Sequence, residues 1–448
     1  MKKFLLVLAA TALALQGFAQ TWNVEEVVRA DRRKLSGCEG PYRFDAPALT
    51  AAPKGYKPFY IGHYGRHGSR YAWNAGTYST IGNMLEAAKS ANALTPRGEQ
   101  LYKDFMEFVT IPQINYGDLS DLGFEQHRQI AQITVKSFPE VFAKGGHVFA
   151  RSSTSQRAIV SMNAFTVSLQ KEVPKLDITA NSRAYNMVVI NAASANRAIA
   201  KRYEGTTKTP EPLADFRDRR IETKSIMDKL FTNTDFIADD RSRTSFLSEL
   251  YSLWAGYHNY SDSNFLEDLL TPDQQFAFWE VENYSNYLSH AGQRYTQISL
   301  LEDFIQYAEA AIAGKGNVMD LRFGHDTVMN AFYALLNING ANFEPDRVED
   351  LKYWFQNYNT PMASTMQFVL YRSKKKPDIL FKLLHNGAEV KLPQLTPVDG
   401  PYYRWNDFTA WARQVMAEHP LLPPSPAPAA GAPGAPAGAP GQGSFRRP

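Results

Sequence analysis

Short apolar runs alternate with segments of helical periodicity along most of the chain. The runs at 147–150 and 318–323 have the length of strands. Each is followed by a stretch in which apolar residues recur three or four positions apart, at 153–165 and 327–338. Such alternation is typical of an α/β core. We therefore expect an α/β fold with a mostly parallel central sheet.

Two further helices are predicted from the residues that begin them. Thr95 precedes Pro96 at the start of an apolar pattern that runs to 109, and Ser120 begins a similar pattern that runs to 133. Threonine and serine accept hydrogen bonds from the free N–H groups of a first helical turn, and proline fits that turn because it has no N–H to lose. Both residues are thus predicted to be N-caps.

The middle of the chain has a different pattern. Between 184 and 295 the apolar residues follow helical spacing with few strand signals, which predicts an inserted helical cap. Two later runs, 366–371 and 378–384, resemble strands joined by a charged turn. The predicted organisation is a core formed by 20–183 and 296–422, with the cap 184–295 inserted into it.

Both ends are predicted to lie outside the fold. Two lysines precede a twelve-residue apolar run from Phe4 to Leu15, and small residues follow at the cleavage-defining positions, so 1–19 is predicted to be a secretory signal peptide. This run is shorter than the roughly 20 residues that span a bilayer, and no later run is long enough. The segment 423–448 is rich in proline, alanine and glycine, which predicts a disordered tail. We expect an exported protein, periplasmic or secreted, with no membrane span.

The net charge argues against one class of partner, and the cysteine count excludes an internal disulfide. The formal net charge is +3, from 48 basic and 45 acidic residues, and it falls to +1 when the two lysines of the predicted signal peptide are removed. A near-neutral protein is a poor ligand for nucleic acid, so no such partner is expected. Cys38 is the only cysteine, so no disulfide can form within the chain.

Three predicted strands lead into basic or imidazole residues. The first is followed by RHGSR, from Arg66 to Arg70, the second by Arg151, and the third by Gly-His-Asp at 324–326. In open α/β sheets the ligand lies beyond the carboxyl ends of the strands, where helix N-termini offer free N–H groups. Arginine can hold two oxygens of a tetrahedral anion at once and keeps its proton. These residues predict a seat for a phosphoryl group.

The same residues resemble the motifs of a known family. Arg66 to Arg70 matches the R-H-G-x-R box of the histidine acid phosphatases, the larger clade of the histidine phosphatase superfamily. The pair at 325–326 matches the H-D box of that family, and 119–126 (LSDLGFEQ) is similar to its L-T-x-x-G-x-x-Q segment. The resemblance covers residues 55 to 395.

Within this clade the chain looks most similar to the bacterial multiple inositol polyphosphate phosphatases, through RHGSRY and the stretch MASTMQFVLYRSKKKPDILFKLLHNGAEVKLP. Two departures stand out. Tyr71 and Ala72 follow the box where many members carry x-Pro, and the acid box is His-Asp where that subfamily often has His-Ala-Glu. The resemblance implies a phosphoglycerate-mutase-like three-layer core with a helical cap, and phosphomonoesterase activity through a phosphohistidine.

The resemblance also implies a role for each candidate residue. His67 is expected to be the nucleophile and Asp326 the proton donor to the leaving group. Arg151, in RSSTSQR, matches the third phosphate-binding arginine of the family. The expected phosphate-binding residues are Arg66, Arg70, Arg151 and His325. No metal or cofactor is expected, because the chain shows no acidic cluster or Cys/His spacing of the usual kind.

For the substrate, the resemblance points first to phosphate esters of the inositol polyphosphate (phytate) class. Such a ligand needs further positive charge around the pocket, and the candidates are Arg32, Arg33, Lys34, Arg217, Arg219 and Arg220, whose ordinary role is a solvated face. A broad-specificity acid or sugar phosphatase is the alternative. A non-catalytic phospholigand-binding surface protein is the alternative from another class.

Overall fold

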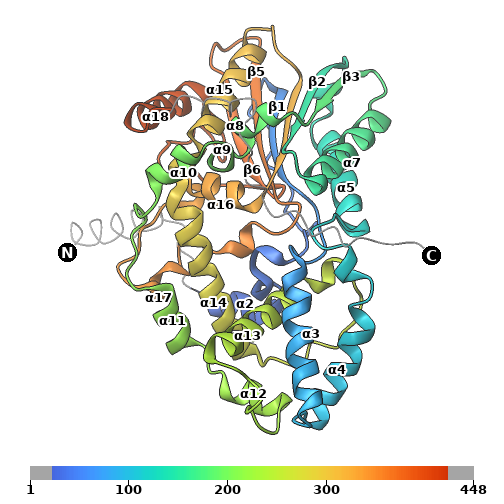
Figure 1. Ribbon diagram of the computed structural model, residues 1–448. Coiled ribbons are helices and arrows are strands. Elements are labelled where there is room, and N and C mark those ends of the chain that lie inside the picture. Colours follow the sequence, from blue (N-terminus) through green and yellow to red (C-terminus); the bar gives the residue numbers. More distant parts are fainter. Residues whose placement is uncertain (1–22, 422–448) are drawn as a thin grey trace, which may run out of the picture.

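The computed structural model describes residues 23–421, so the predicted signal peptide and tail lie outside the described residues. Its centre is an eight-stranded sheet with the order β3-β2-β4-β1-β5-β6-β7, in which β8 also pairs with β6 (Figure 1). The strands are β1 (Tyr56–Arg66), β2 (Gly146–Ser152), β3 (Leu176–Asn181), β4 (Met319–Gly324), β5 (Thr365–Ser373), β6 (Leu380–His385), β7 (Ala388–Glu389) and β8 (Tyr403–Arg404).

The sheet is mixed, with one parallel and one antiparallel half. β3, β2, β4 and β1 run parallel, whereas β5 is antiparallel to β1 and β6 is antiparallel to β5, β7 and β8. The α/β fold is confirmed, and the four apolar runs read as strands fall in β2, β4, β5 and β6. The prediction of a mostly parallel sheet holds only for β3, β2, β4 and β1. The connection between β5 and β6 is too short for anything but antiparallel pairing.

Helices cover both faces of the sheet. Successive side chains of a strand point to opposite faces, so Tyr60 and Tyr64 of β1 pack in one apolar core with α15 and α16, while Ile61 packs in another with α5 and α7. The helices around the sheet are α5 (Asp121–Ser137), α6 (Pro139–Phe142), α7 (Gln156–Glu172), α8 (Met187–Ile190), α9 (Ala192–Ala195), α10 (Arg197–Tyr203), α15 (Ile298–Ile312), α16 (Asp326–Leu335) and α18 (Trp405–Glu418).

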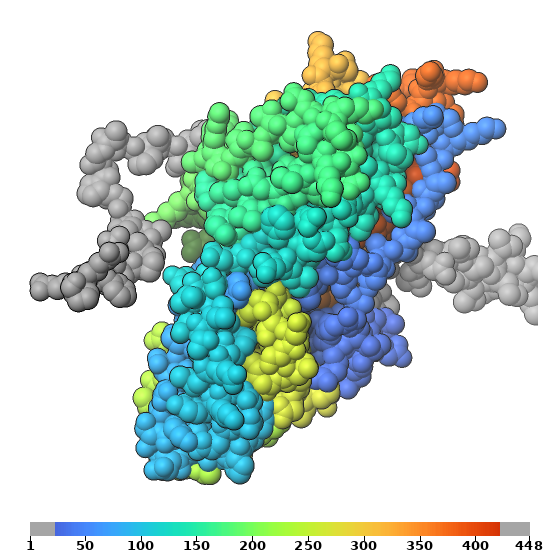
Figure 2. All heavy atoms as spheres, turned by 90° about the vertical axis from the view of Figure 1, so that its right-hand side faces the viewer, coloured from blue at the N-terminus to red at the C-terminus, as the bar shows by residue number. Residues whose placement is uncertain are grey.

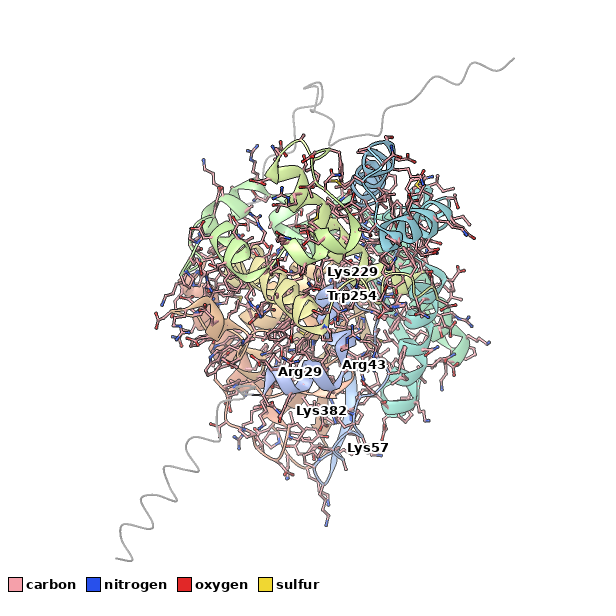
Figure 3. All side chains as sticks on the ribbon, turned by 90° about the horizontal axis from the view of Figure 1, so that it is seen from below. Arg29, Arg43, Lys57, Lys229, Trp254 and Lys382 are labelled. Atoms are coloured by element: carbon pink, nitrogen blue, oxygen red, sulfur yellow. The ribbon has the colours of Figure 1, made fainter. Side chains whose placement is uncertain are left out.

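A second group of helices, here called the helical body, lies below the sheet in Figure 1. Most of its members share one apolar core, in which Trp254 is buried, while Phe216 and Leu351 pack in a second, smaller core; Figure 3 shows Trp254 from below, among the helices. The helices are α2 (Val24–Ala30), η2 (Arg32–Glu39), α3 (Ala75–Ser90), α4 (Pro96–Phe108), α11 (Leu213–Arg220), α12 (Lys224–Leu230), α13 (Asp240–Gly256), α14 (Pro272–Ser289) and α17 (Val348–Leu351).

The helical body is assembled from several parts of the chain. The segment predicted as a cap, 184–295, supplies α11 to α14. Of these, α13 packs on α3 and α12 packs on α4, both from the first quarter of the chain, while α11 packs on α14. Figure 2 shows α3 and α4, in blue and cyan, beside the yellow-green helices of the insertion. Between residues 23 and 421, no helix combines the length and apolarity that a bilayer crossing requires.

Both predicted N-caps are confirmed. The side chain of Thr95 accepts a hydrogen bond from the Gly98 N–H at 3.0 Å, at the start of α4. Ser120 accepts one from the Gly123 N–H at 3.2 Å, at the start of α5. The Ser120 hydroxyl also lies 3.0 Å from the Ser69 carbonyl, so this cap joins α5 to the loop that follows β1.

The loop after β1 rests directly on the first turn of α5. A Cβ atom added at Gly68 would lie 2.4 Å from the carbonyl oxygen of Gly123, and one added at Gly123 would lie 2.2 Å from the carbonyl oxygen of Ser69. These distances are too short for any side chain carbon. The two glycines therefore allow backbone to pack on backbone next to the RHGSR segment.

We predict that Gly123→Ala lowers the free energy of unfolding by about 1–3 kcal/mol, because the added methyl group overpacks against Ser69. Urea unfolding measures this change. Gly82→Ala in α3 is the matched control, because its Cβ would lie 3.4 Å from the ring of Phe105, an ordinary contact. That control should keep or raise stability by up to about 1 kcal/mol, since alanine favours helix. Equal stabilities of the two variants would contradict the close approach.

Candidate active site

The carboxyl ends of β2, β4 and β1 lie side by side, as their order in the sheet requires. Just beyond the strands, the His67 N–H donates to the Gly324 carbonyl at 2.9 Å, and the Ser153 N–H donates to the Phe323 carbonyl at 2.9 Å. These bonds hold the segments that follow β1, β2 and β4 side by side where they leave the sheet. The three sequence segments that were predicted to form an anion seat therefore begin at one edge.

His67 is buried and held in one orientation. Its Nδ1 lies 2.9 Å from the carbonyl oxygen of Gly68, and because a carbonyl can only accept, Nδ1 carries the hydrogen. The lone pair is then on Nε2. Burial, followed by the positive charges of Arg66 and Arg157, holds the pKa of His67 well below its usual value. The ring is therefore neutral, with one nitrogen able to act as a nucleophile.

His325 stands beside His67, with the two ring centroids 5.6 Å apart. Its Nε2 lies 2.9 Å from the hydroxyl oxygen of Ser153, and its backbone N–H donates to the Tyr64 hydroxyl at 3.1 Å. Burial, followed by the charge of Arg157, lowers the pKa of His325 to about 4. His325 is also the N-cap of α16, which makes Asp326 the first residue of that helix.

Arg66 is fully buried at the end of β1. One terminal nitrogen lies 3.1 Å from the carboxylate of Asp326. The other donates to the Thr360 carbonyl at 3.0 Å and to the Cys38 carbonyl. The guanidinium is thereby fixed beside Asp326 and His67.

Arg70 is paired with a carboxylate that sequence reasoning missed. Its Nη2 lies 3.0 Å from the carboxylate of Glu39, the last residue of η2. The same Glu39 oxygen lies 3.7 Å from Arg66. No motif marks Glu39. It lies in the N-terminal segment before β1, which does not follow any predicted strand.

Asp326 carries a negative charge in this structure. Burial acts to raise its pKa, but electrostatic interactions with Arg66, His290 and Arg70 outweigh burial and lower the pKa below its usual range. Its other carboxylate oxygen accepts from the Thr327 N–H at 3.0 Å, at the start of α16. Acting as an acid therefore requires a change in the charge around it.

Arg151 does not join this group, which corrects the prediction for this residue. Its two terminal nitrogens form a two-pronged ion pair with Asp303 of α15, at 2.7 and 3.0 Å. In the sheet, Arg151 of β2 is the register partner of Arg322 of β4, and Arg322 also donates to Asp303. Both side chains leave the sheet on the face that α15 covers. Arg151 is a structural residue beneath the sheet edge.

Arg157, in the first turn of α7, takes the place expected for Arg151. Its charge lowers the pKa of both His67 and His325, and burial followed by Arg70 lowers its own pKa to about 10. It is the second arginine of the stretch RSSTSQR. The available signal was its place in the first turn of the helix after the strand, where helix N-termini bind anions.

Three arginines of the site carry unsatisfied donors. The buried Nε–H groups of Arg66, Arg70 and Arg157 have no hydrogen-bond partner among residues 23–421. Buried donors are nearly always paired. An anion with several acceptor oxygens could satisfy them, which agrees with the predicted phosphoryl seat.

Most of the six additional candidate cations already pair with carboxylates of the protein. Arg219 pairs with Glu211 and Glu349, and Arg220 pairs with Glu280. Arg33 pairs with Asp31, Arg32 donates to Gln275, and Lys34 lies over the ring of Tyr358. Arg217 pairs with Asp218 and also lines a cavity next to the site.

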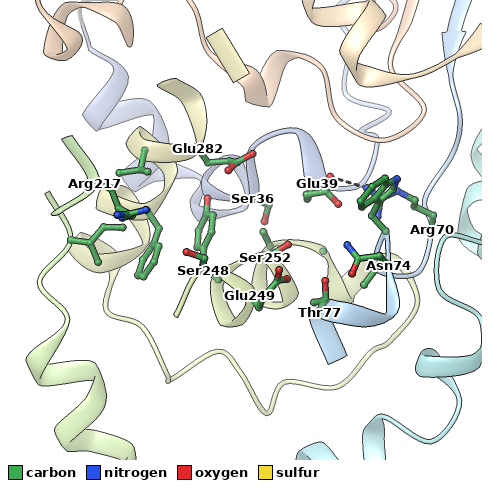
Figure 4. A pocket seen from close by; sticks show the side chains of 18 of the residues that line it. Ser36, Glu39, Arg70, Asn74, Thr77, Arg217, Ser248, Glu249, Ser252 and Glu282 are labelled. Atoms are coloured by element: carbon green, nitrogen blue, oxygen red, sulfur yellow. Dashed lines mark hydrogen bonds and ion pairs between the residues drawn. The ribbon is translucent and has the colours of Figure 1, made fainter. Parts of the chain in front are cut away.

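This cavity, of about 230 Å³, begins at Arg70 and Glu39 and extends into the helical body (Figure 4). Its lining comes from η2, α3, α11, α13 and α14 together with the loop after β1, and His67 and Asp326 are not part of it. The ion pair between Arg70 and Glu39, dashed in Figure 4, thus belongs both to the lining of the cavity and to the group of charged residues beside His67.

One group of potential metal ligands lies here as well. Atoms of Cys38, Glu39 and Asp326 come within 4.8 Å of one another. Burial raises the pKa of the Cys38 thiol, so it stays protonated. Arg66 and Arg70 already supply the positive charge next to both carboxylates. The group does not fit a metal ion.

We predict that Arg157→Ala weakens the binding of inorganic phosphate at least about tenfold, because a charged hydrogen bond contributes roughly 1.5–3 kcal/mol. Isothermal titration calorimetry measures the affinity, and thermal unfolding should show little change.

Arg151→Ala is the matched variant. It should leave the phosphate affinity within about twofold but lower the free energy of unfolding by about 1.5–3 kcal/mol, because it removes charged hydrogen bonds to a buried carboxylate that Arg322 still neutralises. The assignment is wrong if Arg151→Ala abolishes binding in a stable protein while Arg157→Ala does not.

Comparisons with known proteins bear on the fold and on the family of this chain. A search of curated proteins gives no match. Among solved structures, the multiple inositol polyphosphate phosphatase of Bifidobacterium longum in complex with inositol hexasulfate is 19% identical, covers 86% of this chain and 98% of its own, and has a TM-score of 0.65. The phytase from D. castellii is 15% identical, covers 86% of this chain and 85% of its own, and has a TM-score of 0.64. The phytase of Hafnia alvei in complex with tartrate is 13% identical, covers 83% of this chain and 100% of its own, and has a TM-score of 0.54.

At these identities the likeness to solved structures shows the fold. The sequence profile of the Histidine phosphatase superfamily (branch 2) matches residues 65–386, which is most of the chain and contains the RHGSR box, Arg157 and the His-Asp pair. The predicted resemblance is confirmed, and the chain belongs to branch 2 of the histidine phosphatase superfamily.

Proposed function

We propose that this protein is an exported phosphomonoester hydrolase that acts through a phosphohistidine on Nε2 of His67. The observation that carries the proposal is the neutral His67 ring, with Nδ1 bound to the Gly68 carbonyl and the Nε2 lone pair free, next to buried arginines with unsatisfied donors. Export is proposed from the sequence of 1–19 alone.

In the first step, Nε2 of His67 attacks phosphorus and the bond to the ester oxygen breaks. The non-bridging oxygens carry the developing charge, and Arg66, Arg70, Arg157 and His325 lie where donors to them are needed. The departing alkoxide takes a proton from the Asp326 carboxyl, and a water molecule then hydrolyses the phosphohistidine after giving its proton to the Asp326 carboxylate.

Asp326 must gain its proton before it can donate one. In the free protein the nearby positive charges keep it ionised. A bound phosphate ester places negative charge among the same arginines, which offsets their effect and raises the pKa of Asp326. Substrate binding itself thus prepares the acid.

Two substrate classes have support. Inositol polyphosphates are supported by the structural neighbours, which include an inositol polyphosphate phosphatase and a phytase. A broad-specificity acid or sugar phosphatase is supported by the extra cations, because four of the six, Arg33, Arg217, Arg219 and Arg220, are already paired with carboxylates. A non-catalytic phospholigand-binding protein, the third possibility, would bind phosphate without turnover.

Replacing His67 and Asp326 tests the mechanism with generic aryl and alkyl phosphates. His67→Ala should lower kcat by a factor of at least about 10⁴ because it removes the nucleophile. Asp326→Asn should slow alkyl esters by about 10²–10⁴ and aryl esters much less, since aryl leaving groups need little protonation. Colorimetric phosphate release measures both.

His147→Ala is the control for His67→Ala, since His147 lies at the opposite end of β2, bound to Asn317 and Thr179. It should keep full activity. Phosphate binding without turnover in the wild-type protein would favour the non-catalytic alternative, and equal slowing of aryl and alkyl esters by Asp326→Asn would remove its role as proton donor.

The pH profile follows from the lowered pKa of His67. An ordinary histidine becomes protonated, and loses its nucleophilic lone pair, as the pH falls through about 6.5. Because burial and neighbouring charges lower this pKa well below that value, kcat/KM for an aryl phosphate should hold or rise between pH 7 and 5. A loss of activity centred near pH 6.5 would contradict the assignment.

A further inference from the structure

The cavity beside the phosphoryl seat has an unusual lining for a site that receives anions. Three carboxylates face it, from Glu39, Glu249 and Glu282, against two guanidinium groups, from Arg70 and Arg217 (Figure 4). If all five side chains are charged, the wall carries one net negative charge before any neighbour is considered.

Both arginines of the wall are already neutralised. Arg70 lies 3.0 Å from Glu39, and Arg217 lies 2.8 Å from Asp218. The carboxylate of Glu249, which is half-buried on α13, has no hydrogen-bond or ion-pair partner in the part of the chain that the structure describes. No free cation of the wall is therefore left for a second phosphate.

Glu282 adds a carboxyl group deeper in the wall. Asn286 donates a hydrogen bond to it at 2.7 Å, and burial followed by the charge of Glu39 raises its pKa to about 7. Near neutral pH it exists in both protonation states, so it can accept a hydrogen bond from a ligand hydroxyl or donate one. A phosphate group finds no stable counter-charge there.

The remaining lining suits hydroxyl groups and a ring. Neutral hydrogen-bonding side chains surround the carboxylates, and at the mouth the indole of Trp73 is 64% exposed, a flat apolar surface on which a ring can pack. The neutral polar residues are Ser36, Asn74, Thr77, Ser248 and Ser252. The volume of about 230 Å³ is below the roughly 300–1,000 Å³ of sites for drug-sized ligands.

We propose that the leaving group of the substrate is a small hydroxyl-rich ring without a second phosphate, as in a hexose monophosphate, and that Glu249 and Glu282 set this specificity. The proposal rests on the phosphomonoesterase function proposed above. The carboxylates exclude densely phosphorylated rings by like-charge repulsion and accept hydrogen bonds from the hydroxyl groups of the favoured ring.

The test compares kcat/KM of the purified full chain for glucose 6-phosphate and for inositol hexakisphosphate at pH 7. The wild-type protein should favour the hexose phosphate at least about tenfold, since desolvated like charges strongly disfavour binding. Glu249→Gln combined with Glu282→Gln should raise the hexakisphosphate-to-hexose-phosphate ratio at least about fivefold for the same reason. The change should lie mainly in KM, which a loss of fold would not produce.

Glu107→Gln combined with Glu172→Gln is the matched control, because it removes the same two charges from exposed positions on α4 and α7, outside the cavity. It should leave the ratio unchanged. A wild-type preference for the hexakisphosphate, or an unchanged ratio in the double variant, would overturn the inference while leaving the phosphatase function intact. A wild-type protein that hydrolyses neither these esters nor p-nitrophenyl phosphate would refute both.

Discussion

The buried guanidinium of Arg66 is the interaction on which the arrangement of the site depends. It binds the Asp326 carboxylate of α16, the Thr360 carbonyl before β5 and the Cys38 carbonyl of η2, while its own backbone ends β1. Four segments from both halves of the molecule thus meet on one side chain. An unpaired buried charge is costly, so these partners stabilise Arg66 as much as Arg66 positions them.

The same ion pairs create a competition at the anion seat. Arg66 and Arg70 are held by Asp326 and Glu39, so a phosphate ester must share or displace internal carboxylates. This arrangement keeps the arginines ordered before substrate arrives, which limits the reorganisation needed on binding. It also links the charge of the ligand to the protonation of Asp326.

The sequence predicted the parts of the fold that rest on local pattern. The strands β2, β4, β5 and β6 and the caps Thr95 and Ser120 follow from apolar runs and side-chain chemistry. The helical body could not be delimited in this way, because α3 and α4 join helices from more than 100 residues later through packing alone. Long-range packing leaves no local signal.

The candidate site was predictable where a motif lies directly at a strand end, as for His67 and Asp326. The exchange of Arg157 for Arg151 was not, because the direction of the Arg151 side chain depends on the pleat of β2 and on Asp303, a partner on a distant helix. Glu39 was missed for a related reason. Its role arises from where η2 is docked.

The contacts of Arg66 also affect how the protein acquires its fold. The groups that it joins are spread from Cys38 to Thr360, so a nascent chain contains no complete seat until more than three quarters of it has been synthesised. Contacts between residues so far apart in sequence form late and slow the search for the native state. The pocket around Arg66 is therefore completed only when the segment that carries Thr360 has reached its place in the fold.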